Sequence, residues 1–316
     1  MEVDLVIENA TVVTASDVHA RQDIVVRDGK ILAVGQDLKS IFSAKTTIDA
    51  QHAFVMPGGV DSHVHLDQET TSKPAHAPPS QAAPPPSSPS LRSPAPKSPS
   101  TPSWRTTTAA PQASHYGFHL ILTNPTPSIL RDELPHYVRE GISSVKLYMT
   151  YEPLKLRDGE ILDVMMATRA LGMTTMVHAE NSDMISWITA RLAEQALTAP
   201  YYHAISRPNI AEDEAVYRVI SLAELSDVPI LITCPHYLYL TADALRPNHP
   251  AHDAFSGAKH ICSPPLREDA MDLEAMWTGI VNGTFTTFSS DHAPSKYDHP
   301  SGKKAGLAAD GGMREA

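Results

Sequence analysis

The chain has 316 residues, 42% of them hydrophobic, which is enough for one large domain with a sizeable core and a small second one. Its formal net charge is −11, and no basic stripe interrupts the acidic background, which argues against a nucleic-acid partner. Two cysteines are too few for a disulfide framework, and no apolar run approaches the ~20 residues that span a bilayer. We therefore expect a soluble cytoplasmic protein with no membrane partner.

Residues 1–56 have the pattern of a small all-β lobe. Short runs rich in β-branched residues are separated by turn signals, and the pair Asp28-Gly29 is typical of a two-residue hairpin. We interpret this segment as a β-sandwich lobe, with strands expected at residues 3–7, 11–14, 23–26 and 31–34.

Residues 57–68 contain a His-x-His pair at the end of an apolar strand. His63 and His65 point to the same face of a strand, because successive side chains alternate between faces. Two imidazoles on one face are suited to a divalent metal. A chance pair is the alternative, but the bend at Gly58-Gly59 and the carboxylate of Asp61 favour a metal site.

Residues 69–113 break this pattern with a tract rich in proline and serine. Twelve of the 27 prolines fall here, and such a segment buries too little apolar surface to offset the entropy of ordering it. We expect a disordered insert. A docking segment for proline-recognising domains is one interpretation, and a shifted reading frame or misplaced splice junction is the interpretation we favour.

From residue 116 onwards strands alternate with helices, which indicates parallel βαβ units and an α/β fold. Strands are expected at 118–122, 144–149, 174–178, 229–233 and 285–290, with a strand-like run at 259–262. Helices are expected at 132–140, 161–171, 183–197, 212–225 and 268–281. So many units in one domain predict a (β/α)8 TIM-type barrel made of residues 57–68 and 114–305, with the irregular tail 306–316 outside it.

Polar side chains occur where these strands end, which is where a barrel carries its chemistry. Lys146 lies inside an apolar strand, His178 and Asp291 each end a strand, and Ser263 begins a rigid Ser-Pro-Pro turn. Taken alone, the lysine could reach the rim, the histidine could be a hydrogen-bonded cap and the aspartate a helix N-cap. Together with the His-x-His pair, they suit metal-assisted hydrolysis.

The motifs around these residues resemble the dihydropyrimidinase and hydantoinase branch of the amidohydrolase superfamily. The likeness covers residues 1–68 and 115–305, and its motifs are Val-Asp-Ser-His-Val-His-Leu (60–66), Val-Lys-Leu-Tyr-Met-Thr-Tyr (145–151), Met-Val-His-Ala-Glu-Asn (176–181), Ser-Pro-Pro-Leu-Arg (263–267) and Ser-Asp-His-Ala-Pro (290–294).

The resemblance implies a barrel beside a β-sandwich and a centre of two divalent ions, with zinc the expected metal. His63 and His65 would bind one ion, a carbamate on Lys146 would bridge both, and His178 would bind the second. Asp291 would bind the first ion and act as general base and then acid.

The same resemblance implies that Tyr151 supports the oxyanion and that Ser263 holds the substrate ring through its backbone. The expected reaction is hydrolysis of a dihydropyrimidine or hydantoin to an N-carbamoyl amino acid, a step of pyrimidine catabolism, by a homo-oligomer that is a tetramer in the family.

Three departures from the family pattern predict an incomplete barrel and impaired activity. The tract at 69–113 replaces a helix and the second barrel strand, and the strand before Thr233-Cys234-Pro235 lacks the family's further histidine ligand. The last barrel strand and the returning sandwich strands have no counterpart after residue 305. Two alternatives stay open: a non-catalytic dihydropyrimidinase-like scaffold, or a dihydroorotase- or allantoinase-type hydrolase.

Overall fold

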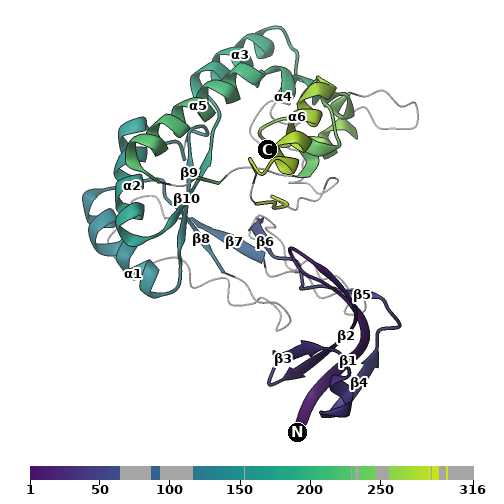
Figure 1. The fold of residues 1–316 in the computed structure, drawn as a ribbon. Helices are drawn as coiled ribbons and strands as arrows, with labels where there is room; N and C mark the ends of the chain where they lie inside the picture. Colours follow the sequence, from purple (N-terminus) through teal and green to yellow (C-terminus); the bar gives the residue numbers. More distant parts are fainter. Residues whose placement is uncertain are drawn as a thin grey trace. The chain divides into compact units, whose positions relative to one another are not determined.

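The computed structural model describes residues 1–64, 87–92, 117–152, 154–228, 230–231, 235–246, 256–285, 287–291 and 297. Contacts divide the chain into two compact units, Met1–Gly59 and Val60–Ala316 (Figure 1). None of the helices in the described part of the chain combines the length and hydropathy that a membrane span requires.

The first unit is a single five-stranded sheet. The central strand β1 pairs antiparallel with β2 and parallel with β4 and β5, while β3 pairs with β2 at the edge. The strands are β1 (Glu2–Val13), β2 (Val18–Arg27), β3 (Lys30–Gly35), β4 (Ser43–Asp49) and β5 (Phe54–Val55). The strands β4 and β5 have no counterpart among the predicted ones.

The hairpin between β2 and β3 turns at Asp28 and Gly29, as predicted from that pair. Both residues have positive φ, 52° and 72°, as a type I′ turn requires. Small apolar clusters form around Val6 and Ile24, while Ile31 and Phe54 remain more than 60% exposed. Because the 59 residues of this unit form one sheet, the facing sheet of the expected sandwich stays a prediction.

The second unit is built on six parallel strands whose order in space follows their order in the chain. The order is β6–β7–β8–β9–β10–β11, the topology of a (β/α) barrel. The strands are β6 (Asp61–Val64), β7 (Ser87–Arg92), β8 (His119–Ile121), β9 (Ser144–Tyr148), β10 (Thr174–His178) and β11 (Ile230–Leu231).

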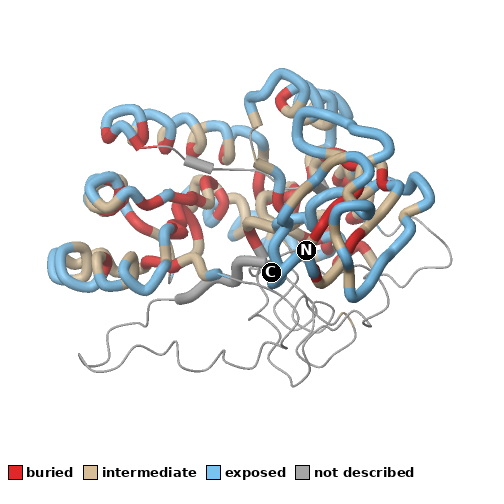
Figure 2. Tube along the Cα trace, turned by 60° about the horizontal axis from the view of Figure 1, so that its bottom comes forward, coloured by how far each residue is buried: buried red, intermediate tan, exposed pale blue. Residues whose placement is uncertain are grey.

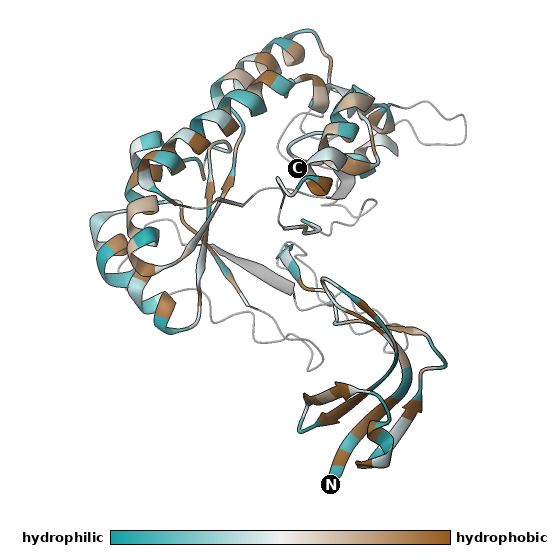
Figure 3. Cartoon of the chain, viewed as in Figure 1, coloured by the Kyte–Doolittle hydropathy of each residue, from teal (hydrophilic) through white to brown (hydrophobic). Residues whose placement is uncertain are grey.

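Helices follow β8, β9 and β10, and α2 and α5 pack against each other and cover β9 and β10 on one side of the sheet (Figure 1). Both helices carry hydrophobic and hydrophilic residues (Figure 3), and they bury Ile161 of α2 and Val219 of α5 in the main core. The α-helices are α1 (Leu134–Arg139), α2 (Asp158–Leu171), α3 (Ser182–Glu194), α4 (Tyr201–Ile205), α5 (Asn209–Ser226) and α6 (Ala270–Val281). Shorter turns are the 3-10 helices η1 (Leu38–Ser40), η4 (Pro235–Leu238), η5 (Ala242–Leu245) and η6 (Ser256–His260), and the π-helical η3 (Ile129–Glu133).

Strand β9 is buried on both faces, as in a parallel sheet covered from both sides (Figure 2). Val145 and Leu147 join the main hydrophobic core, together with Ile161 of α2. Because side chains alternate along a strand, Lys146 and Tyr148 point to the opposite face. The packing of α2 on one face therefore places the lysine on the other.

Three predicted segments differ from the structure. The tract 69–113 is expected from its sequence to lack regular structure, but its residues 87–92 form β7. A parallel strand at this place supplies hydrogen-bond partners to both β6 and β8. The remaining residues of the tract lie outside the described chain. The run 259–262 is not a strand: Lys259 and His260 are the last residues of η6, whose Ala258 packs with Leu245 of η5. The described residues of 285–290 are not assigned as a strand, although their end hydrogen-bonds to β6.

Candidate active site

One cavity of about 530 Å³ in the second unit brings the predicted polar residues together. It is lined by His63 of β6, Lys146 of β9, His178 of β10, and by Ser263 and Asp291. These residues are up to 228 positions apart in the sequence, and the parallel strands carry three of them to the same face. His65 lies outside the described residues.

His63 and Asp291 form the closest pair of predicted ligands. The distance from His63 Nε2 to Asp291 Oδ1 is 3.4 Å, and both side chains are largely buried. Two ligand atoms that each lie ~2.1 Å from one ion, at a tetrahedral angle, stand roughly 3.4 Å apart. The pair therefore fits two ligand positions of one metal.

Asp61 fixes this pair by tying the late segment to β6. Its carboxylate accepts hydrogen bonds from the backbone N–H of Ser290 at 3.0 Å, from the Ser290 hydroxyl, and from the N–H of His63 at 3.3 Å. The N–H of Asp291 donates to the carbonyl of His63 at 2.9 Å. Asp291 also has a left-handed backbone, with φ 47°, which is uncommon for a residue with a side chain. These bonds hold it in that conformation.

Lys146 is only 7% exposed, and its Nζ lies 5.5 Å from the centre of the Tyr148 ring. A protonated amine cannot bind a cation, whereas a carbamate formed on that amine has oxygen atoms that can. Among the described residues, no three His, Cys, Asp or Glu side chains cluster closely enough to hold a metal by themselves. A metal centre here thus depends on a modified lysine, on His65, or on both.

His178 is oriented by a buried carboxylate two residues further on. Its Nε2 lies 2.7 Å from Oε2 of Glu180, which is 1% exposed. Burial works to raise the pKa of Glu180, but the hydrogen bond from His178 and the charge of Arg207 outweigh it, so the net shift is downward. With the proton on Nε2, the lone pair of His178 is on Nδ1. A carboxylate holding the far nitrogen is a common arrangement for a histidine that binds a metal.

The strand–helix junction after His178 is set locally by Asn181. Its side-chain oxygen accepts hydrogen bonds from the N–H groups of Asp183 and Met184, at 3.1 and 3.0 Å, and so caps α3. Because β10 ends at His178 and α3 begins at Ser182, this cap fixes the short connection that carries Glu180.

Tyr151 lies next to His178, with ring centres 5.1 Å apart. Its backbone is left-handed, with φ 70°, so two predicted catalytic residues, Tyr151 and Asp291, share this uncommon conformation. Burial raises the pKa of the Tyr151 phenol, and the nearby charge of Glu180 adds to the effect. The phenol therefore stays protonated at neutral pH and remains a hydrogen-bond donor.

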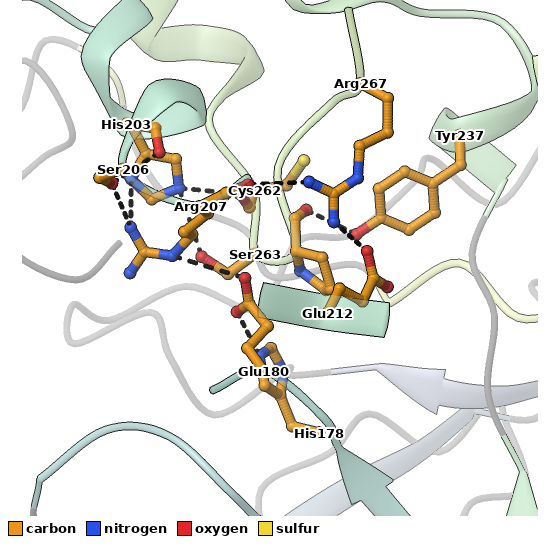
Figure 4. A network of polar contacts seen from close by, with 11 residues as sticks. His178, Glu180, His203, Ser206, Arg207, Glu212, Tyr237, Cys262, Ser263 and Arg267 are labelled. Carbon is orange, nitrogen blue, oxygen red and sulfur yellow. Dashed lines mark hydrogen bonds and ion pairs between the residues drawn. The ribbon is translucent and has the colours of Figure 1, made fainter. Parts of the chain in front are cut away.

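Ser263 is held in a loop that is anchored from three sides (Figure 4). The Tyr237 hydroxyl donates to the carbonyl of Pro264 at 2.6 Å, and Arg267 donates to the carbonyl of Arg207 at 2.8 Å. The ring of His203 lies 3.0 Å from the carbonyl of Cys262. The backbone around Ser263 is thereby positioned before any ligand arrives.

Comparison with known proteins identifies the family, although no family model matches the chain. The D-hydantoinase of Geobacillus stearothermophilus is 32% identical over 322 residues, 90% of this chain and 66% of the relative. The D-hydantoinase of Ralstonia pickettii is 32% identical over 325 residues, 92% of this chain and 68% of the relative. The chain belongs to the hydantoinase and dihydropyrimidinase branch of the amidohydrolases.

Solved structures agree with this assignment. A D-hydantoinase structure matches with a TM-score of 0.79 at 30% identity, covering 93% of this chain and 70% of that chain. The dihydropyrimidinase of Brevibacillus agri matches with a TM-score of 0.78 at 29% identity, covering 93% and 69%. The chain spans about two thirds of the length of the curated relatives it matches.

The predicted family and the predicted incomplete TIM-type barrel are therefore confirmed. This branch consists of metal-dependent hydrolases of small cyclic amides. The strand before Thr233-Cys234-Pro235 is described only over Ile230–Leu231, so the predicted loss of a histidine ligand there lies outside the described residues.

Sequence reasoning assigned no role to four polar residues beside the hydantoinase-type site. Glu180, His203 and Arg207 are each at most 3% exposed and connect His178 to the Ser263 loop. The ring of His119 lies between the hydroxyl of Ser144 and the carbonyl of Ser62, and packs edge-on to His63. The motif at 176–181, which contains Glu180, is part of the family likeness, but the burial and the contacts that give these four residues a role are not readable from spacing.

Proposed function

We propose that the cavity of the second unit hydrolyses a cyclic amide, a dihydropyrimidine or a hydantoin, to an N-carbamoyl amino acid with the help of bound divalent ions. The observation that carries the proposal is the shared cavity of His63, Lys146, His178, Ser263 and Asp291. Membership in the hydantoinase branch supports the choice of substrate class.

The donor set favours one strong metal position and one weaker one. His63, His65 and Asp291 would hold the first ion, and the 3.4 Å separation of His63 and Asp291 suits this role. A carbamate on Lys146 would serve both ions, and His178 would hold the second. Since we expect a single histidine, His178, at the second position, that position would bind its ion more weakly.

The bound ions would activate the attacking water and polarise the ring carbonyl. Asp291, at the cavity wall, accepts a proton from that water as its oxygen bonds to the carbonyl carbon. The protonated Asp291 then delivers the proton to the ring nitrogen as the carbon–nitrogen bond breaks. One water is consumed and the ring opens to a carboxylate and an N-carbamoyl group.

Tyr151 and Ser263 would act on the substrate directly. The protonated phenol of Tyr151 donates a hydrogen bond to the carbonyl oxygen, where negative charge develops. The Ser263 backbone binds the polar edge of the ring. These two interactions with the substrate are stronger where water is excluded. The apolar side chains of Met176 and Pro264 line the cavity beside the polar residues and help to exclude it.

We further propose zinc as the resident ion, a carbamate on Lys146, cytoplasmic location and assembly into a homo-oligomer, all of which rest on the family likeness. In domain terms, residues 1–56 form the lobe and residues 57–68 with 114–305 form the hydrolase barrel. The tract 69–113 is an insert and 306–316 a tail.

The proposal is tested by measuring hydrolysis of dihydrouracil and of a 5-substituted hydantoin by the zinc-loaded chain. We expect N-carbamoyl product from the parent chain and none from Asp291→Asn, which retains the shape of the carboxylate but cannot accept the proton. Absence of turnover in the parent chain with zinc bound would refute the proposed activity. Equal turnover by Asp291→Asn would refute the role of that residue.

A further inference from the structure

A chain of buried polar side chains joins the metal-binding end of β10 to the loop that carries Ser263 (Figure 4). It runs from His178 to Glu180, Arg207 and His203, and ends at the carbonyl of Cys262. The exposed fractions of Glu180, Arg207 and His203 are 1%, 3% and 0%. Groups this deeply buried need partners within the protein.

Arg207 stands at the centre of this chain. Its Nη1 lies 3.3 Å from Nδ1 of His203 and 3.2 Å from the hydroxyl of Ser206, and its Nε lies 3.7 Å from Oε1 of Glu180. A guanidinium can only donate hydrogen bonds. The Nδ1 of His203 must therefore accept, which leaves the ring proton on Nε2.

That proton determines what His203 does at the substrate side. An Nε2–H group donates to the carbonyl of Cys262 at 3.0 Å, and the hydroxyl of Ser263 lies 3.4 Å from the same nitrogen. The peptide unit between Cys262 and Ser263 is thus oriented by a histidine whose tautomer the arginine has set.

On the other side, the arginine charge offsets that of Glu180. The carboxylate, kept as an acceptor, takes the Nε2–H of His178 at 2.7 Å and leaves Nδ1 of that ring free of a proton. An unprotonated ring nitrogen is what a metal needs from a histidine. One buried guanidinium is therefore in contact with both halves of the site.

We propose that Arg207 is a positioning residue that sets the tautomers of His178 and His203 together, and thereby couples the metal-binding side of the cavity to the side that holds the substrate ring. The inference rests on the proposed function for what the two sides bind. The tautomers themselves do not depend on it.

The competing explanation is an ion pair that only stabilises the fold. Arg218 offers a control, because it too joins packed elements through carboxylates, Glu214 at 3.0 Å and Asp158 at 3.1 Å, and contacts neither Glu180, His203 nor Ser263 directly. Glu214 also accepts a hydrogen bond from Asn181 at 2.6 Å, so this control shares the α3 cap but not the polar chain through Arg207. Arg218→Met removes an ion pair between α5 and α2 that is more exposed than that of Arg207, with side chains 34% and 45% exposed, and leaves the contacts of Arg207 in place.

The experiment compares the parent chain with Arg207→Met, Arg207→Lys and Arg218→Met. Nitrogen-15 spectra of the metal-free chain report the tautomers, with His178→Gln and His203→Gln used to assign the two rings. Zinc affinity is measured by competition with a chromophoric chelator, and KM and kcat are measured with dihydrouracil. The tautomer measurement needs neither metal nor turnover.

We expect Nε2-protonated rings for both histidines in the parent chain and in Arg218→Met. In Arg207→Met both rings should become tautomer mixtures, with zinc affinity reduced about 10- to 100-fold and a higher KM. In Arg207→Lys the retained charge should preserve the His178 tautomer, while the loss of the forked donor should release His203 and raise KM alone.

Parent tautomers in both Arg207 variants, or zinc affinity in Arg207→Met equal to that of Arg218→Met, would overturn the proposal. If Arg207→Met does not fold, the His203 tautomer and KM of Arg207→Lys decide it. A parent chain with the expected tautomers but no hydrolysis would refute the proposed function and leave this inference supported.

Discussion

Asp61→Ala should loosen the junction that brings Asp291 to His63. The carboxylate accepts three hydrogen bonds, from the His63 N–H, the Ser290 N–H and the Ser290 hydroxyl. A partly exposed charged acceptor contributes about 1 kcal/mol for each such bond, so Asp61→Ala should lower the free energy of unfolding by ~3 kcal/mol. Because Asp291 would then be held mainly by its own N–H, zinc affinity should fall about 10- to 100-fold.

Urea unfolding and zinc competition measure the two effects on the same samples. Asp61→Asn should lose much less, since the amide oxygen still accepts and the amide N–H can pair with the Ser290 hydroxyl. Asp49→Ala is the matched control: it removes hydrogen bonds from Asn9 and Gln51 in the first unit and should leave zinc affinity unchanged. Unchanged zinc affinity in Asp61→Ala, despite the stability loss, would refute the reasoning that this carboxylate places Asp291.

Three further changes test separate parts of the account. Tyr151→Phe should lower kcat by about 10²-fold or more in steady-state kinetics with little change in KM, because the lost hydrogen bond forms to the developing oxyanion. Glu160→Ala removes the carboxylate that caps α2, where the hydrogen bond from Arg157 holds the pKa of Glu160 below its usual range. The parent chain should be about 1 kcal/mol more stable in urea than this variant above pH ~4.3, and the difference should disappear as the pH falls through the lowered pKa. Ile161→Ala, at a fully buried position of α2, should cost about 2–5 kcal/mol, whereas Met166→Ala on the exposed side of the helix should cost far less.

Each of these has an outcome that would count against it. A rise in KM with unchanged kcat would make Tyr151 a binding residue only. A stability difference between the parent chain and Glu160→Ala that persists at acid pH would show that the charge of the Glu160 carboxylate is not involved. Equal losses for Ile161→Ala and Met166→Ala would contradict the assignment of the buried face of α2.

The elements and residues that sequence could predict are those governed by local chemistry. The hairpin at Asp28-Gly29, the helices α2 and α5 and the strand around Lys146 follow from turn preferences and periodicity, which act over a few residues. In the candidate site, His63 and His178 could be picked because they lie near the ends of strands, and Lys146 because it interrupts an apolar strand. Asp291 is expected from the sequence to end a strand at 285–290 that the structure does not show over the described residues, although hydrogen bonds tie this segment to β6.

What sequence did not reveal depends on contacts between distant segments. The run 259–262 has a strand-like composition, but its first two residues belong to η6, which packs against η5. Residues 87–92 read as a proline-rich linker, yet lie between two strands with open hydrogen-bonding edges. The roles of Glu180, His203 and Arg207 come from burial and from contacts between residues up to 60 positions apart, which no local pattern encodes.

The central claim is that His63, Lys146, His178 and Asp291 meet around divalent ions, and a zinc-loaded crystal structure with anomalous scattering data tests it most directly. We expect a zinc peak within ~2.0–2.2 Å of the His63 and Asp291 ligand atoms, and extra density of a carbamate on Lys146 directed at the metal. Zinc bound elsewhere, or an unmodified Lys146 pointing away from the two residues, would contradict it.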